Sequence, residues 1–235
     1  MEIKNYSSQE LSERLILTTI NFTENEDKLE DFPYIQKGNF ALLTQLCLGE
    51  KNEFGDFTAC ITVTNSMMEK WGIEKNIIFE IAADNSKKLF PVLYERMNEH
   101  LEKRMKDEIF ELPHEFNIKD VVVLTNEKHF NGAATMFYEP DILDVICREI
   151  GEDELILMPS SVNQIYCMPY KDDEQLQELE SVYKEFVLEN GIEDALTNGL
   201  LTYDNEIKLI TEMNGLSYRL DLTETKRYNT QNTHR

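Results

Sequence analysis

The chain has 235 residues, of which 41% are hydrophobic, and its 23 basic and 45 acidic side chains give a formal net charge of −22. A composition of this kind predicts a globular protein with a full core, as one domain or two small lobes, and excludes a disordered chain. The negative charge disfavours direct contact with nucleic-acid phosphates and with an anionic membrane surface. No apolar run approaches the roughly 20 residues that a membrane-spanning helix needs.

The first 106 residues alternate between helix and strand patterns. Helix-capping residue types and the spacing of apolar side chains set the expected boundaries. The predicted elements are, in chain order, a short helix that opens near Ser7, a polar loop over 21–31, strands over 40–48 and 57–64, a helix capped by Asn65 or Ser66 and ended by Gly72, an amphipathic helix that breaks at 84–86, and a helix over 90–106.

Residues 121–170 have the densest apolar pattern in the chain, and we interpret them as two hairpins around one helix. The Asn131-Gly132 dipeptide is typical of a turn with positive φ, and Gly151 is typical of a helix C-terminus. The predicted elements are strands over 121–124 and 133–138, a helix over 142–150, and strands over 155–158 and 164–168.

The fold class predicted from these patterns is α+β, with antiparallel β-hairpins packed against helices. Each half has a hairpin followed by a helix that ends at a glycine, Gly72 or Gly151, so we infer pseudo-duplicated hairpin-helix units. The expected domains are an N-terminal helix and acidic loop over 1–30, an α+β domain over 31–215 with sub-lobes 31–110 and 111–215, and a polar tail over 216–235.

Residues 172–194 predict an acidic amphipathic helix, and residues 199–203 and 207–210 predict a final hairpin. Apolar residues recur in this helix at helical spacing, so its acids are expected on the outer face. A solvated face and a docking surface for a basic protein both fit that pattern. The candidate partner-binding residues on this face are Glu178, Glu185, Glu189 and Glu193.

The runs VLTN, GAATMFYEPDILDVICREIG and ELILMPSSVNQI resemble an uncharacterised domain-of-unknown-function family of clostridial proteins. The resemblance covers roughly residues 31–210. The resemblance implies that some members are carried on integrative and conjugative elements, and that members have a further N-terminal segment which this chain lacks. It implies no particular activity. The family pattern has His-Glu where this chain has Asn163 and Gln164, and neutral amides there weaken any acid–base role for the loop.

The chain shows no catalytic or phosphate-binding motif, so we expect no catalytic residue and no cofactor. A metal site is not expected either. In an ideal helix His100 points about 100° away from Glu99, which shares a face with Glu95. The four cysteines lie in apolar segments and form no C-x-x-C pair, which favours reduced structural thiols. They are Cys47, Cys60, Cys147 and Cys167. The N-terminus has no signal-peptide pattern, so a cytoplasmic protein is expected.

Three polar residues beside predicted strands are candidate ligand contacts: Asn126, Ser160 and Ser161. Each has a turn-forming role as its alternative, because Asn and Ser side chains bond nearby backbone in turns. A serine nucleophile would need a base, and the neighbouring amides of Asn163 and Gln164 cannot act as one.

Two functions remain open. The first is an accessory protein of a bacterial mobile element that binds a basic partner protein through its acidic surface, with an anti-defence or nucleic-acid-mimicking role as a narrower version. The second is a small-ligand-binding protein or enzyme with a pocket between the two hairpin units, lined by Asn126, Ser160 and Ser161. The lack of catalytic motifs favours the first, and the sequence does not give the oligomeric state.

Overall fold

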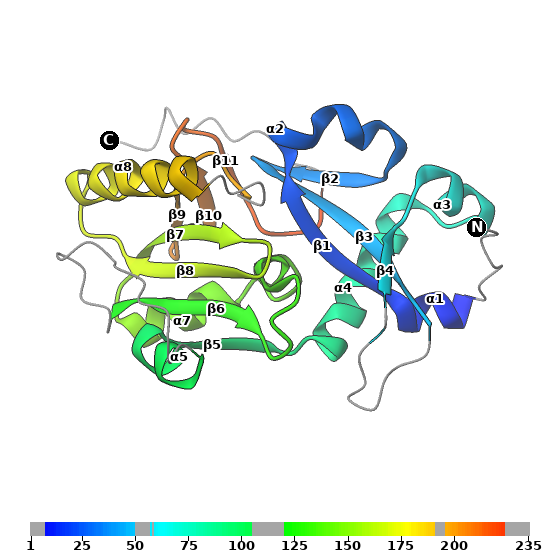
Figure 1. Ribbon diagram of the computed structural model, residues 1–235, viewed down its shortest axis with the longest axis horizontal. Coiled ribbons are helices and arrows are strands. Elements are labelled where there is room, and N and C mark those ends of the chain that lie inside the picture. Colours follow the sequence, from blue (N-terminus) through cyan, green and yellow to red (C-terminus); the bar gives the residue numbers. More distant parts are fainter. Residues whose placement is uncertain (1–7, 50–56, 58, 105–119, 191–195, 224–235) are drawn as a thin grey trace.

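The computed structural model describes residues 8–49, 57, 59–104, 120–190 and 196–223 (Figure 1). Within these residues two antiparallel sheets are packed with helices, so the predicted α+β class is confirmed. No helix in the described part of the chain is long and apolar enough to span a membrane.

The first sheet is built around β3 (Phe40–Leu48). β1 (Leu15–Asn21) pairs with residues 40–46 of β3. β2 (Tyr34–Lys37) pairs with residues 40–43, and β4 (Ala59–Thr62) pairs with residues 45–48. The predicted pairing of the strands near 40–48 and 57–64 is therefore confirmed.

Three helices belong to the same half of the chain as this sheet: α1 (Ser8–Arg14), α3 (Asn65–Trp71) and α4 (Lys75–Leu89). The side chain of Thr64, not of Asn65 or Ser66, caps α3 by accepting from the Met67 amide, and Gly72 ends it with φ 64°.

The predicted break of α4 at residues 84–86 is wrong, because this part of the helix is held against β1. The Asn85 side chain donates to the Leu15 carbonyl at 2.8 Å. The Leu17 amide donates to Ser86 Oγ at 2.8 Å. Both polar side chains are buried and satisfied by strand backbone, so they stabilise the helix at a point where their propensities oppose it.

Residues 21–31 are not a loop. Asn21 ends β1, and the residues after it form α2 (Phe22–Asn25) and the 3₁₀-helix η1 (Glu26–Asp31). The Asn21 side chain caps α2 by accepting from the Glu24 amide. The short length of these helices gives little periodicity in the sequence, which explains why the pattern predicted a loop.

The second sheet has the order β11-β10-β9-β7-β8-β6-β5 and is antiparallel throughout. The predicted hairpins near 155–168 and 199–210 are confirmed. The strands are β5 (Val92–Arg96), β6 (Val122–Asn126), β7 (Glu154–Ser161), β8 (Gln164–Pro169), β9 (Leu201–Asp204), β10 (Leu209–Glu212) and β11 (Ser217–Tyr218).

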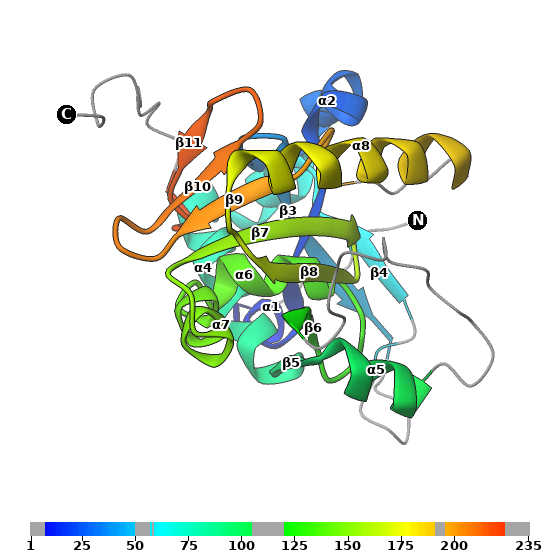
Figure 2. The ribbon, with the colours of Figure 1, turned by 90° about the vertical axis from the view of Figure 1, so that its left-hand side faces the viewer.

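Helices cover both faces of this sheet (Figures 1 and 2). α8 (Asp173–Asn190) packs on one face, where Leu176, Leu179 and Tyr183 join Val123 and Ile156 in a buried cluster. α7 (Ile142–Ile150), the helix predicted over 142–150, packs on the other face and ends at Gly151 in the left-handed conformation.

Two predictions in this half are wrong. Residues 133–138 are not a strand but form η3 (Gly132–Ala134) and α6 (Thr135–Tyr138). All of these side chains are buried, and a short run that is apolar on every side does not distinguish strand from helix. Because this strand does not form, the second hairpin-helix unit of the inferred duplication is not present in this stretch.

The helix predicted over 90–106 is instead β5 followed by α5 (Met97–Arg104), as far as the described residues extend. β5 pairs with β6 over its whole length, from Val92 opposite Asn126 to Arg96 opposite Val122. The pairing of this edge strand overrides the helical spacing of its apolar residues.

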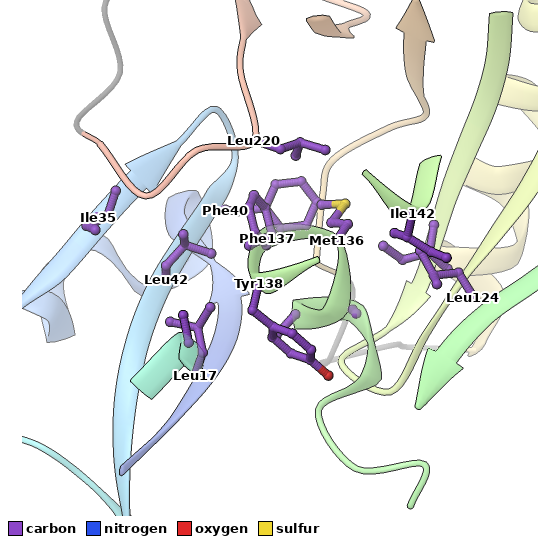
Figure 3. Close-up of a cluster of buried hydrophobic side chains, with 14 of the residues drawn as sticks. Leu17, Ile35, Phe40, Leu42, Leu124, Met136, Phe137, Tyr138, Ile142 and Leu220 are labelled. Atoms are coloured by element: carbon purple, nitrogen blue, oxygen red, sulfur yellow. The ribbon is translucent and has the colours of Figure 1, made fainter. Parts of the chain in front are cut away.

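One core connects the two sheets. The rings of Phe40, from β3, and Phe137, from α6, meet edge to face with centroids 5.3 Å apart. Figure 3 shows this pair between Leu42 of the first sheet and Leu124 of the second. Leu220 also joins this core, and Tyr218 is fully buried, so the first part of the predicted polar tail belongs to the fold. Residues 224–235 lie outside the described residues.

Candidate functional site

The outer face of α8 carries both predicted partner-binding residues whose side chains the structure describes. Glu178 and Glu185 are exposed, as are Asp173 and Glu174 at the start of the helix. Burial of the opposite face, which includes Leu176 and Leu179, fixes the rotation of the helix. The side chain of Glu189 and all of Glu193 lie outside the described part of the chain.

Glu180 departs from the expectation that the acids of this helix face outward. It is only 6% exposed, and its Oε2 accepts the Leu200 amide at 2.7 Å. Its Oε1 lies 3.0 Å from Lys184 Nζ. Glu180 therefore attaches α8 to the segment before β9, and the positive charge of Lys184 is directed to this buried carboxylate.

Carboxylates also gather at the N-terminal end of α8, beside the first residues of β7. The hydroxyl of Tyr170 donates to Asp173 at 2.7 Å. This hydrogen bond, with burial and the charges of nearby carboxylates, raises the pKa of Tyr170 to about 12. Burial and the charges of Asp204 and Asp153 raise the pKa of Glu154. Burial is the largest cause of this shift, and the smaller contribution from repulsion shows that Asp204 and Asp153 lie near Glu154.

These carboxylates form one acidic surface together with the outer face of α8. We call it the α8 acidic surface. It consists of Asp153, Glu154, Asp172, Asp173, Glu174, Glu178 and Glu185.

The predicted ligand residue Asn126 organises a loop. It is fully buried at the end of β6. Its Nδ2 donates to the Phe130 carbonyl at 2.8 Å, and its Oδ1 accepts the Lys128 amide at 3.1 Å. These bonds fix residues 127–131 in a turn, which is the alternative role that the sequence left open.

Ser160 and Ser161 likewise make hydrogen bonds within the β7–β8 turn. Ser160 Oγ donates to the Gln164 carbonyl at 3.4 Å, and Ser161 Oγ accepts the Asn163 amide at 3.2 Å. The Ser160 side chain is also hydrogen-bonded to Tyr166. Among the described interactions, neither serine hydroxyl is bonded to a histidine or a carboxylate that could act as a base.

The structure does bring the two loops together, through Asn163. Its Oδ1 accepts the Asn131 amide at 3.1 Å, and its carbonyl accepts Thr125 Oγ1 at 2.7 Å. A Cβ on Gly132 would lie 2.1 Å from the Asn163 carbonyl, so only glycine permits this approach. Asn163 thus serves as a contact between the two loops.

A pocket of about 420 Å³ lies elsewhere, between α4, α6 and the segment after β11. Its wall combines apolar and aromatic side chains with three carboxylates and one lysine, and none of the predicted ligand residues lines it. The lining residues are Glu80, Ala83, Asp84, Lys87, Phe137, Tyr138, Pro140, Leu220, Asp221 and Leu222. Sequence reasoning missed this pocket because three distant segments build it.

His100 lies on α5 and not on the single helix predicted over 90–106. His100 is buried, and its Nδ1 lies 2.7 Å from Glu95 Oε1. The two residues meet because Glu95 belongs to β5 while His100 belongs to α5, so they do not share one continuous helix. The His129 ring is 6.3 Å from the His100 ring. Among the described residues no group of three or more His, Cys, Asp or Glu is arranged to hold a metal ion.

Comparisons with known proteins place the chain in a family but assign no activity. Searches of curated proteins and of solved structures find no match. A family model matches residues 2–205, which extends the resemblance well before residue 31. Because this match covers most of the chain, the protein belongs to the family of unknown function DUF5688.

Proposed function

We propose that the protein is a non-enzymatic accessory protein that binds a basic partner protein through the α8 acidic surface. The observation that carries this proposal is the division of charge on α8. Glu180 and Lys184 pair with each other at the buried edge of the helix, while Glu174, Glu178 and Glu185 are directed to solvent. The outer face therefore presents exposed carboxylates, and the positive charge of Lys184 is directed to Glu180.

The charge spacing favours discrete Lys and Arg contacts over a full imitation of duplex nucleic acid. Four acids lie on the described outer face between Asp173 and Glu185, a length of roughly 18 Å at 1.5 Å per residue. A duplex carries about ten phosphate charges over that length, at one per 1.7 Å. An anti-defence role by nucleic-acid mimicry is accordingly the narrower version of the proposal. The proposal also includes that the protein is encoded on a bacterial mobile element and acts in the cytoplasm.

The concentrated charge makes a prediction about how binding responds to salt and pH. Encounters driven by exposed charges weaken as ionic strength shortens the Debye length, from about 10 Å at 0.1 M to about 3 Å at 1 M. A basic partner near Glu154 would favour its ionised form, so complex formation is expected to release protons where Glu154 titrates.

The test begins with capture of partners from nuclease-treated host lysate at low and high salt. The captured protein is then purified, and its Kd is measured by calorimetry with two matched variants. One carries Glu174→Lys, Glu178→Lys and Glu185→Lys on α8. The control carries Glu24→Lys, Glu26→Lys and Glu30→Lys on α2 and η1, which are also exposed. Both triple variants change the net charge by the same amount.

We expect the α8 variant to lose at least about tenfold in affinity, since each close charge pair at an interface contributes on the order of 1 kcal/mol or more. The control variant is expected to keep nearly all of it. Equal weakening of both variants would show that only bulk charge matters, and normal binding by the α8 variant would contradict the proposal directly.

A second candidate is small-ligand binding, which the pocket between α4 and α6 supports. Its carboxylates Glu80, Asp84 and Asp221 outnumber its single base, Lys87, which lies 3.6 Å from Glu139. Aromatic and apolar walls with a negative rim suit a cationic amphipathic molecule. A thermal-shift screen of such compounds tests this, with Asp84→Lys as the variant expected to abolish any stabilisation and Asp153→Lys, far from the pocket wall, as the control.

A further inference from the structure

Two of the four cysteines meet across neighbouring strands. Cys47 on β3 lies directly opposite Cys60 on β4, in a register that also pairs Leu46 with Ile61. The two Sγ atoms are 2.8 Å apart. We propose that this dithiol is a redox-modification site, which converts reversibly to a cross-strand disulfide by exchange with a low-molecular-weight disulfide.

The backbone is already placed for the bond. Residues directly opposite in an antiparallel pair have Cα atoms about 4.5–5.5 Å apart, and disulfides join residues whose Cα atoms are about 4.4–6.8 Å apart. Closing the bond therefore needs a small rotation of two side chains and no change of register.

Arg14 ties together the chain on both sides of this pair. Its Nη1 donates to the carbonyls of Cys47, at 3.4 Å, and of Gly49, at 2.7 Å. Its guanidinium lies over the ring of Phe57, 5.4 Å from the centroid. One side chain from α1 thus contacts the end of β3 and the approach to β4, which holds the two cysteines in place.

The two thiols differ in access, and this sets the order of reaction. Cys60 is partly exposed on a short edge strand, whereas Cys47 is buried. The hydrogen bond with Cys47 lowers the pKa of Cys60, although burial opposes this effect. In contrast, burial raises the pKa of Cys147 to about 12 and also raises that of Cys167. Cys60 is the thiol that a small disulfide reaches first.

The exchange proceeds in two displacements. The Cys60 thiolate attacks one sulfur of the disulfide RSSR, so its S–S bond breaks and one RS⁻ leaves and takes up a proton. Cys47 then gives its proton to solvent and attacks the Cys60 sulfur, which releases the second RS⁻. Two electrons pass from the protein thiols to RSSR, and the products are the Cys47–Cys60 disulfide and two RSH. Excess RSH reverses both steps.

The disulfide would join β4 covalently to β3 and close the connection over residues 48–59. Closing a loop of this size restricts the unfolded chain, and for a protein of this length we expect the Tm to rise by roughly 5–10 °C. The same bond would attach the edge strand β4 to the first sheet covalently.

The experiment uses the full-length protein in buffers with set ratios of oxidised to reduced glutathione. After acid quenching, free thiols are alkylated and the peptides are mapped by mass spectrometry. We expect oxidised buffer to yield a Cys47–Cys60 cross-linked peptide while Cys147 and Cys167 are alkylated, and reduced buffer to remove the cross-link. The variant Cys60→Ser is expected to abolish the Tm shift, and Cys147→Ser is expected to keep it.

Two outcomes would overturn the proposal. One is a stable mixed disulfide between Cys60 and glutathione with Cys47 still alkylated, which would show that the second displacement does not occur. The other is a fully reduced dithiol in the most oxidising buffer. Both are read from the unsubstituted protein, so the test stands even where a serine variant does not fold.

Discussion

Lys37 of β2 and Asp221, which follows β11, form an ion pair with Nζ and Oδ1 2.8 Å apart. The Lys37 side chain is 2% exposed, whereas that of Asp221 is 50% exposed. The contact joins residues 184 positions apart and attaches the C-terminal segment to the first sheet. A buried ammonium requires a partner, so this pair adds to the β10–β11 pairing and the burial of Tyr218 and Leu220 in holding the chain after residue 215 to the fold.

We expect Asp221→Asn to lower the free energy of unfolding by about 1–3 kcal/mol, because it leaves the Lys37 charge buried without an anion. Lys37→Met is expected to cost less, since it removes the charge together with its need for a partner. Urea unfolding of both variants measures the difference. An Asp221→Asn protein as stable as the unsubstituted one would show that the ion pair contributes nothing.

This pair also predicts a pH dependence. Burial tends to raise the pKa of Asp221, but the hydrogen bond and charge of Lys37, with bonds from Thr223, lower it overall. The stability that the ionised carboxylate contributes is therefore present above its unfolded pKa and is lost as the pH falls through the lower folded pKa. Asp221→Asn should remove this part of the acid sensitivity.

Glu212 is expected to show the opposite dependence. It is buried, and burial raises its pKa even though the Asn39 amide and the Asn214 side chain donate to it. The folded protein holds the Glu212 proton more tightly than the unfolded chain, so stability falls as the pH rises from the unfolded pKa to the raised folded pKa. Glu212→Gln should remove this fall and leave the protein at least as stable at neutral pH.

Urea unfolding between pH 4 and pH 8 tests this prediction. The exposed neighbour Glu206 supplies the control, and Glu206→Gln is expected to leave the pH profile unchanged. If Glu212→Gln follows the same profile as the unsubstituted protein, burial of this carboxyl does not govern stability in that range.

Elements with one buried face could be predicted from the sequence, because their periodicity is visible there. α7 has an apolar stripe with Gly151 at its end. The strands β7 and β8 are buried on both faces, and their short apolar runs on either side of a Ser-rich turn, rather than a period, predicted them. A segment that is buried on all sides shows no apolar periodicity in its sequence. Residues 133–138 are uniformly buried and form a helix where we expected a strand. Local pattern cannot decide such segments, since their conformation is set by distant contacts.

The same reasoning separates the parts of the candidate site. Helical periodicity was sufficient to direct Glu178 and Glu185 outward. It could not reveal that Glu180 faces the Leu200 amide, because that amide comes from a segment twenty residues later. The facing thiols of Cys47 and Cys60 depend on strand register, which a single sequence does not specify.

The contact between α4 and β1 gives a sharp test of helix continuity. Ser86→Ala leaves the buried Leu17 amide without its acceptor and is expected to cost about 1–3 kcal/mol of unfolding free energy. Asp84→Ala, two residues away on the exposed side, is the matched control and is expected to change stability by less than about 0.5 kcal/mol. A Ser86→Ala protein as stable as the Asp84→Ala protein would show that the Ser86 contact contributes nothing to stability, since both changes raise helix propensity.

The close approach at Gly132 makes a prediction about the two loops that hold Asn126 and Ser161. Gly132→Ala places a Cβ against the Asn163 carbonyl and Thr125, both of which are backbone or anchored groups. We expect the loops to separate, with a loss of about 1–3 kcal/mol. Hydrogen exchange at the Asn131 amide measures this locally, because its acceptor is Asn163 Oδ1. Unchanged protection there would contradict the proposed packing.

Two acids on α8 allow structural and binding roles to be measured separately. Glu180→Ala removes the acceptor of the Leu200 amide and the partner of Lys184, so it is expected to cost about 2–3 kcal/mol of unfolding free energy. Glu178→Ala, exposed on the same helix, is expected to leave stability nearly unchanged and to weaken only the binding of a basic partner. Urea unfolding and calorimetric titration of both variants give the two readouts. If Glu178→Ala destabilises the protein as much as Glu180→Ala, the outer face contributes to folding, and weakened binding by its charge variants could no longer be assigned to a lost contact with the partner.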